Sequence, residues 1–126
     1  MTHTIRLFML IEAATFAIAA LVHSGVLITG YAHQQAAIAE GVIALVLLGG
    51  VVVTWIRPAW LWHAGVAAQG FALLGTLVGL FTIAMGIGPR TIPDIAYHIS
   101  IVMVLVWGLR VAMRARSEPV TYAPQG

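Results

Sequence analysis

The sequence predicts an all-α integral membrane protein, an antiparallel four-helix bundle with both termini cytoplasmic. Hydrophobic residues make up 61% of the 126 residues and charged residues only 8%, against about 25% charged residues in soluble domains. Six basic and four acidic side chains are too few to cover a soluble protein of this length, so lipid is the expected solvent. At about 20 apolar residues per crossing, the chain has room for four spans and no separate soluble domain.

The composition also excludes several classes of function. The chain contains no cysteine, which removes thiolate metal sites, iron–sulfur clusters, c-type haem attachment and disulfide exchange. Its six basic residues are all arginines, and outside the carboxyl-terminal region they stand singly at segment ends. A nucleic-acid-binding protein has clustered basic residues with exposed aromatic side chains. We therefore expect a lipid bilayer, and no nucleic acid, as partner.

Four apolar runs within one predicted domain, residues 1–116, account for the spans, which we place at residues 7–29, 35–56, 59–87 and 93–114. The first run is too long for the core of a signal peptide, so we interpret it as a retained span. Pro58 is expected to open the third helix after a tight hairpin. The breaker cluster Gly86-Ile87-Gly88-Pro89 ends the third run. The tail, residues 117–126, is predicted to be a disordered cytoplasmic segment.

The placement of arginine predicts the orientation. With four spans, five of the six arginines fall on one side and only Arg90 falls on the other. The positive-inside rule makes the side with five arginines cytoplasmic, and this side carries both termini. Trp55, Trp60 and Trp62 bracket the hairpin on the same side, as expected of an interfacial aromatic belt.

The third run carries a motif of small residues, Gly75-x-x-x-Gly79. Small residues four apart lie on one helix face and let a neighbouring helix approach closely, because lipid supplies no hydrophobic drive for helices to associate. We interpret the Gly75/Gly79 face as a helix-packing groove, used within the chain, by a homo-oligomer or by a partner in a membrane complex. A ligand that needs close approach to the backbone is the alternative.

Ionisable residues within the predicted spans are the candidates for function, because they are costly in hydrocarbon. His23 lies six residues from the outer end of the first span, and Glu40 and His98 lie five residues from the outer ends of the second and fourth. A rise of about 1.5 Å per residue places all three about 8–9 Å deep. Asp94 shares a helix face with His98. Because the first helix of a four-helix bundle neighbours the second and the fourth, His23 can meet partners on both of them.

These side chains match a set of metal ligands. Two imidazoles with one or two carboxylates suit Zn, Fe or Mn, and the thioether of Met85, at comparable depth, would favour Cu. His23 and His98 could instead hold haem b (heme) axially, with a carboxylate orienting one imidazole. The metal prediction therefore names His23, Glu40, Asp94 and His98, and the haem prediction names His23 and His98.

Simpler interpretations exist for parts of this cluster. Thr91-Ile92-Pro93-Asp94 fits a capping box at the start of the fourth helix, a role that Asp94 can combine with binding. His33 lies in the first loop and is expected to be solvated. The cluster as a whole could also be a set of interhelical hydrogen bonds, worth on average about 0.6 kcal/mol each in membranes.

A second polar group lies nearer the predicted cytoplasmic ends and consists of Glu12, Gln69 and Arg110. We expect Arg110 to snorkel back and pair with Glu12. The alternative is a proton or ion path, because Glu12 and His23 are eleven residues apart and so about 20° apart around the helix. Such a path would use Glu12, His23, Glu40 and Gln69.

The stretch from Gly70 to Gly79, followed by Gly88-Pro89-Arg90-Thr91-Ile92-Pro93-Asp94 and Tyr97-His98, resembles small bacterial four-span membrane proteins that carry no assigned activity. The resemblance implies a protein of the bacterial inner membrane and brings no chemistry with it. The outer histidines also resemble those of four-helix membrane cytochromes. Glu40 departs from that pattern, because a haem pocket is usually apolar at such a position.

Three functions follow from the sequence. The favoured one is a membrane protein that binds a metal ion or haem b at His23, Glu40, Asp94 and His98, with or without a redox role. The second is a transport module for protons, ions or a small solute. The third is a structural subunit of a larger membrane complex. No catalytic residue is predicted, and whether the chain is an enzyme stays open.

Overall fold

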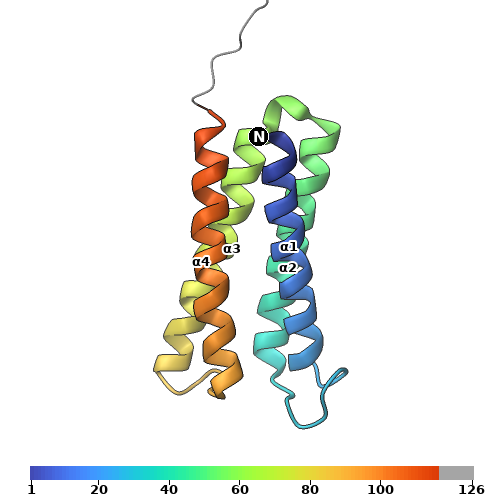
Figure 1. Cartoon of the computed structure of the whole chain (residues 1–126). Helices are drawn as coiled ribbons and strands as arrows, with labels where there is room; N and C mark the ends of the chain where they lie inside the picture. Colours follow the sequence, from blue (N-terminus) through green and yellow to red (C-terminus); the bar gives the residue numbers. More distant parts are fainter. Residues whose placement is uncertain (117–126) are drawn as a thin grey trace, which may run out of the picture.

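The structure, a computed structural model, describes residues 1–116 as a bundle of four long helices that run up and down in turn (Figure 1). The helices are α1 (Thr2–His23), α2 (Gln34–Ile56), α3 (Leu61–Ala84) and α4 (Ile92–Arg114), and the short 3-10 helix η1 (Pro58–Trp60) precedes α3. The predicted all-α four-helix bundle is confirmed. The tail predicted to be disordered, residues 117–126, lies outside the described residues.

The two ends of the bundle differ in what they carry. The N-terminus, the α2–α3 connection and the end of α4 lie together at one end (Figure 1). The other end, which we name the distal end, carries the loops of residues 24–33 and 85–91. Functional candidates on α1, α2 and α4 that lie near these two loops are therefore brought to the same end of the molecule.

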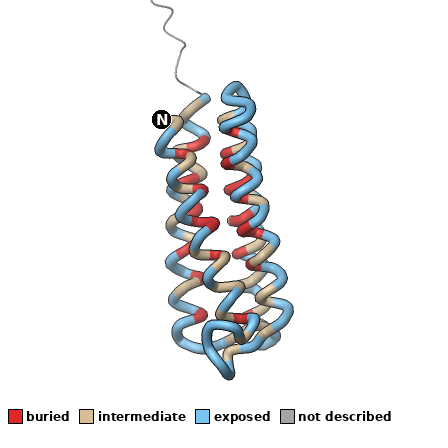
Figure 2. Tube along the Cα trace, turned by 90° about the vertical axis from the view of Figure 1, so that its right-hand side faces the viewer, coloured by how far each residue is buried: buried red, intermediate tan, exposed pale blue. Residues whose placement is uncertain are grey.

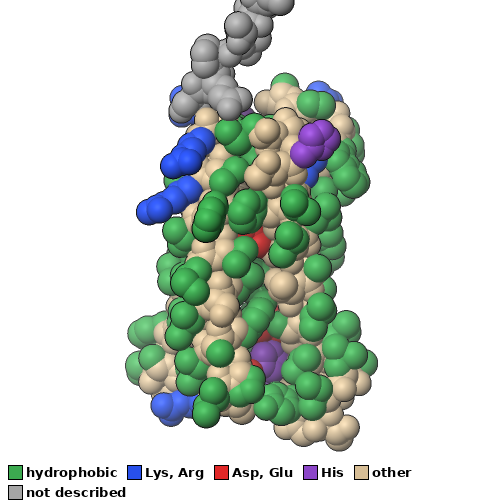
Figure 3. Space-filling view, viewed as in Figure 1, with side chains coloured by type: hydrophobic (Ala, Val, Ile, Leu, Met, Phe, Trp, Pro, Cys, Tyr) green, Lys and Arg blue, Asp and Glu red, His purple; other side chains and the backbone are tan. Residues whose placement is uncertain are grey.

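All four helices are long and apolar enough to cross a membrane. Hydrophobic side chains cover most of the face seen in Figure 3, and arginines are visible mainly toward the end that carries the termini. Buried residues line the inward sides of the helices (Figure 2). They include the fully buried Ile5, Met9, Leu47 and Leu105. An apolar exterior around four such helices indicates a multi-pass membrane protein.

Small residues set the distance between the helices. A Cβ at Gly50 of α2 would lie 2.8 Å from the Cβ of Ala68 on α3, and one at Gly75 would lie 2.9 Å from Cδ1 of Ile43. A Cβ at Gly79 would lie 3.2 Å from Nε2 of His98 on α4. The predicted Gly75/Gly79 packing face is thus used within the chain, against α2 and α4, and its use by a homo-oligomer stays a prediction.

The first helix ends earlier than the apolar run that predicted it. α1 covers Thr2–His23, whereas the predicted span covered residues 7–29. Gly25 and Gly30 have φ of 79° and 92°, which glycine adopts readily and other residues do not. The backbone N–H of His33 donates to the carbonyl of His23 at 2.7 Å and closes the loop at its base. His23 is therefore the last residue of α1, not a residue six positions inside it.

Three other boundaries follow the predicted breakers and caps, whereas α1 begins at Thr2, earlier than the predicted residue 7. Pro58 opens η1, which leads directly into α3, as expected. α3 ends at Ala84, just before Gly86, whose φ is 80°. Thr91 caps the start of α4.

Candidate functional site

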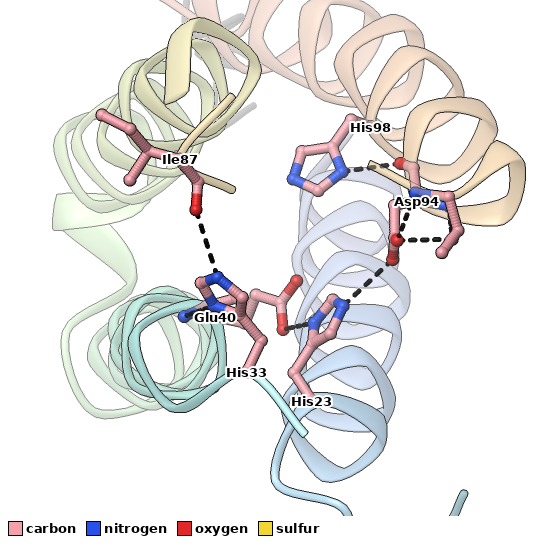
Figure 4. Close-up of polar contacts among 8 residues, drawn as sticks. His23, His33, Glu40, Ile87, Asp94 and His98 are labelled. Atoms are coloured by element: carbon pink, nitrogen blue, oxygen red, sulfur yellow. Dashed lines mark hydrogen bonds and ion pairs between the residues drawn. The ribbon is translucent and has the colours of Figure 1, made fainter. Parts of the chain in front are cut away.

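Three helices each contribute one ionisable side chain to a buried cluster at the distal end (Figure 4). Nδ1 of His23 lies 2.7 Å from Oε2 of Glu40, and Nε2 of the same ring lies 3.0 Å from Oδ1 of Asp94. The three residues are only 3%, 5% and 6% exposed. His23, at the end of α1, therefore links α2 to α4, and we name these three residues the bridged cluster.

The bridged cluster holds two hydrogens between its three side chains. A carboxylate only accepts hydrogen bonds, and a neutral imidazole has a single N–H. Two hydrogen bonds between one ring and two carboxyl groups therefore require an imidazolium between two carboxylates, or a neutral imidazole with one protonated carboxyl group. Both arrangements carry a net charge of −1, and they differ only in where one proton lies.

Asp94 combines two roles. One carboxylate oxygen accepts hydrogen bonds from the backbone N–H of Thr91 at 3.0 Å and from the Thr91 hydroxyl. The Thr91 Oγ1 in turn accepts from the backbone N–H of Asp94 at 3.3 Å, which completes the predicted capping box. The other oxygen contacts His23. The cap therefore fixes the orientation of the carboxylate that His23 meets, and the positive end of the helix dipole favours its negative charge.

His98 lies one turn along α4 from Asp94 and is 8% exposed. Its Nδ1 lies 2.7 Å from the backbone carbonyl of Asp94, and because a carbonyl only accepts, Nδ1 carries the hydrogen of this bond. In the neutral ring, Nε2 then keeps a free lone pair. The absence of a side chain at Gly79 leaves space next to this nitrogen. The ring of Tyr97 packs edge-on against the imidazole, with centroids 5.5 Å apart.

A cavity of about 170 Å³ lies beside the cluster, between α2, α3 and α4. The polar side chains on its buried wall are Glu40, Thr76, Thr82 and His98, and its apolar side chains include Phe16, Ile43 and Ile83. Oε1 of Glu40 is buried and has no hydrogen-bond partner within residues 1–116. In Figure 4 this oxygen points into the space between His98 and Ile87. Glu40 therefore meets His23 with one oxygen and the cavity with the other.

His33 has a structural role that the sequence analysis missed. It is half-buried and caps α2, because its Nδ1 accepts a hydrogen bond from the backbone N–H of Ala36 at 3.3 Å. Its Nε2–H donates to the carbonyl of Ile87 at 3.3 Å and ties the start of α2 to the loop after α3 (Figure 4). The prediction of a solvated loop histidine is wrong, because both ring nitrogens are bonded within the protein.

The predicted metal set is brought together only in part. His23 contacts both Glu40 and Asp94, whereas His98 contacts the Asp94 backbone. Within residues 1–116, no group of three or more His, Asp or Glu side chains is placed to hold a metal ion. Met85 is 61% exposed. Binding of a metal ion or haem through His23 stays a prediction, and it requires His23 to release one of its carboxylates.

The inner polar group also differs from its prediction. Glu12 and Gln69 are both fully buried, and Nε2 of Gln69 donates to Oε2 of Glu12 at 3.2 Å. The expected pairing of Glu12 with Arg110 is wrong. Gly108 of α4 faces the Glu12–Gln69 pair, since a Cβ there would lie 2.7 Å from Oε1 of Glu12. Arg110 is two residues further, about 200° around the helix, and points away into an exposed position.

The threonines of the cavity wall were not predicted from the sequence either. Thr76 donates its hydroxyl hydrogen to the carbonyl of Ala72, and Thr82 donates to the carbonyl of Gly79, each at 2.7 Å. Such bonds are common for threonine in apolar helices, so the residue type gives no signal. Only the placement of α3 against α2 and α4 shows that these oxygens line the same cavity as Glu40 and His98.

Comparison with known proteins assigns no family to this chain, since no family model, curated protein or solved structure matches it.

Proposed function

We propose that this chain is a multi-pass protein of the bacterial inner membrane, with both termini in the cytoplasm, and that it is a transport module that exchanges protons at the bridged cluster. In this orientation the distal end and the cluster lie on the periplasmic side. The support for the orientation is the arginine count, with five of six arginines on the side of the termini.

The observation that carries the proposal is the bridging position of His23, with both ring nitrogens bonded to buried carboxyl groups. Imidazole can accept a proton on one nitrogen and give one up from the other. A proton can therefore pass from Asp94 to Glu40 through the ring without any movement of a helix. Chains of carboxyl groups and histidines inside membrane spans are a recurring feature of proton relays.

The second oxygen of Glu40 extends this relay to the cavity. Oε1 is buried, has no hydrogen-bond partner in the described part of the chain, and points toward His98. An unpartnered buried acceptor is costly, so a structural role alone gives no reason to keep it. A carboxyl group that meets a relay on one side and a cavity on the other can transfer a proton between them.

Proton flux into vesicles tests the proposal. The full-length chain is reconstituted with a pH-sensitive dye inside the vesicles, and a potassium diffusion potential drives the flux. We expect flux with the unmodified chain and at least a tenfold loss with His23→Gln, which can bond to both carboxyl groups but cannot carry the charge. His3→Gln, at an exposed terminal position, is the matched control and should leave the flux unchanged. Equal flux with both variants would refute the proposal.

Binding of a metal ion or haem is the second candidate, and the observation that favours it is that Glu40 and His98, two of the four predicted ligands, line the same cavity. Absorbance spectra and elemental analysis of the purified chain test it, beside His23→Ala and His98→Ala. A Soret band or stoichiometric Zn, Cu, Fe or Mn that both variants lose would establish this function. A chain with neither proton flux nor cofactor would fit a structural subunit of a larger complex.

A further inference from the structure

The cavity beside Glu40 offers hydrogen-bond acceptors on its buried wall. Oε1 of Glu40 has no hydrogen-bond partner among residues 1–116, and Nε2 of neutral His98 keeps its lone pair because Nδ1–H is bonded to Asp94. Thr76 and Thr82 have each given their hydroxyl hydrogen to a helix carbonyl, so they present only lone pairs. His33 has used its N–H on Ile87 in the same way. A ligand that matches this wall must therefore be a donor of several hydrogen bonds.

The net charge of the bridged cluster also favours a ligand of this kind, and one that is positively charged. The bridged cluster carries a net charge of −1 with its two hydrogens in place, and no arginine lines the cavity. A positive ligand on Oε1 of Glu40 would neutralise the cluster in surroundings where an uncompensated charge is expensive. A neutral donor such as an alcohol would leave that charge in place.

The volume of the cavity and its apolar lining favour a ligand with an apolar body over an inorganic cation. The cavity of about 170 Å³ is lined mainly by apolar side chains, including Phe16, Ile43, Ile83 and Ile87. An engineered apolar cavity of about 150 Å³ binds benzene, which has six non-hydrogen atoms. A ligand of similar size with an apolar body would fill the space, whereas an inorganic cation would leave most of it empty.

We propose that this cavity binds a small primary ammonium ion with an alkyl body of four or five carbons, with its –NH₃⁺ group between Oε1 of Glu40 and Nε2 of His98. The –NH₃⁺ group supplies three donors and no acceptor, so two of its N–H groups can donate to these two atoms. This ammonium ion would be the cargo of the proposed transport function, and its role as cargo rests on that proposal. The cargo cation and a proton on Glu40 would neutralise the same charge, so the two are expected to exclude each other.

Binding of n-pentylammonium to the full-length chain in detergent tests the inference. We expect saturable binding, seen as a shift of the ¹⁵N resonance of His98 Nε2 and a rise in the thermal unfolding midpoint. n-Pentanol, of the same shape without the charge, should bind at least tenfold more weakly. Tetrabutylammonium, which is too large and has no N–H, should not bind.

Two pairs of variants locate the site. Gly79→Ala places a methyl group 3.2 Å from Nε2 of His98 and should weaken n-pentylammonium binding at least tenfold. Gly70→Ala on the same helix has no atom within 4 Å of the new Cβ and should bind as the unmodified chain does. Glu40→Gln removes the charge while keeping the shape, and should also weaken the affinity for n-pentylammonium at least tenfold. His3→Gln should leave this affinity unchanged.

Several outcomes would overturn the inference: equal affinity for n-pentylammonium in all variants, binding of n-pentanol as tight as that of the ammonium, or stoichiometric binding of zinc alone that displaces the ammonium. Its failure is distinguishable from failure of the proposed function. If proton flux depends on His23 but no ammonium ion binds, only the ligand assignment is refuted. If ammonium binding depends on Glu40 but there is no proton flux, the proton exchange is refuted and the ligand site is retained.

Discussion

Asp94 shows how one side chain can serve both the fold and the site. Its two oxygens face different partners, Thr91 at the helix start and His23 on another helix. Because the cap holds the carboxylate in one orientation, the contact with His23 needs no further ordering of the Asp94 side chain. The contact with His23 is thus positioned by an interaction that stabilises α4 in any case.

Substitutions at the capping box should separate these two contributions. Thr91→Ala removes the hydroxyl bonds of the capping box, keeps the His23 partner, and should lower the free energy of unfolding by about 1 kcal/mol. Asp94→Ala removes the cap and the His23 partner together, and should cost about 2–4 kcal/mol. Chemical unfolding in detergent measures both. Ser100→Ala on the same helix removes an exposed hydroxyl and should change stability by less than about 0.5 kcal/mol. Equal losses for Thr91→Ala and Asp94→Ala would show that the His23 contact contributes nothing.

Glu12 should couple to Gln69 and not to Arg110. Double-mutant cycles with alanine at these positions should give a coupling energy of about 0.5–3 kcal/mol for Glu12 and Gln69, which are in contact, and less than about 0.5 kcal/mol for Glu12 and Arg110. Unfolding of the single and double variants provides the four free energies for each cycle. A larger coupling to Arg110 than to Gln69 would contradict the observed hydrogen bond.

At the scale of the helices, close approach depends on positions where a methyl group has no room. Gly50 and Gly49 are adjacent in α2, yet only Gly50 faces α3. Gly50→Ala should lower the free energy of unfolding by about 1–3 kcal/mol, because its Cβ would meet that of Ala68 and neither can move independently of its helix. Gly49→Ala, with open space around the new Cβ, should be neutral or stabilising by up to about 1 kcal/mol. Thermal unfolding of the two variants gives the comparison, and equal effects would show that α2 and α3 can separate without cost.

The helices also show where a hydrophobic pattern is informative and where it is not. Apolar runs predicted all four helices, and Pro58 and Thr91 predicted two starts. The end of α1 could not be predicted in this way, because the loop after His23 carries the exposed apolar residues Val26, Leu27 and Ile28. Their hydrophobicity extends the run without extending the helix. Backbone conformation at Gly25 ends the helix, and hydropathy does not report it.

For the whole molecule, the arrangement of the termini and loops makes the predicted topology testable with two matched residues. Ala32 lies in a distal loop and Ala59 lies between α2 and α3 at the opposite end, and both are exposed. The chain has no cysteine of its own. In intact bacterial cells, Ala32→Cys should react with a membrane-impermeant thiol reagent and Ala59→Cys should react only after the inner membrane is opened. The reverse pattern would invert the topology.

The sequence predicted which helices bring polar residues together in the bundle, and did not predict which atoms of these residues make contact. Helix neighbours placed His23 with Glu40, since residues that are costly in lipid must face inward. The predicted third member was His98, whereas the structure puts Asp94 against His23. Which atoms meet could not be predicted, because it depends on side-chain rotation. His98 turns its Nδ1 back to its own helix, and Arg110 points away from the Glu12 that it was expected to reach. The cavity depends on the fit of three helices and has no linear signature.

The bridged cluster also has a consequence for biogenesis. Its members come from α1, α2 and α4, which leave the ribosome in that order, so His23 and Glu40 can meet as soon as the first hairpin is inserted, while Asp94 arrives only with α4. Until then, Nε2 of His23 has no carboxylate to bond, and the growing chain keeps a costly polar group exposed in its unfinished bundle. A nascent chain that stops short of α4 would keep this defect, and a chain that includes α4 would conceal it.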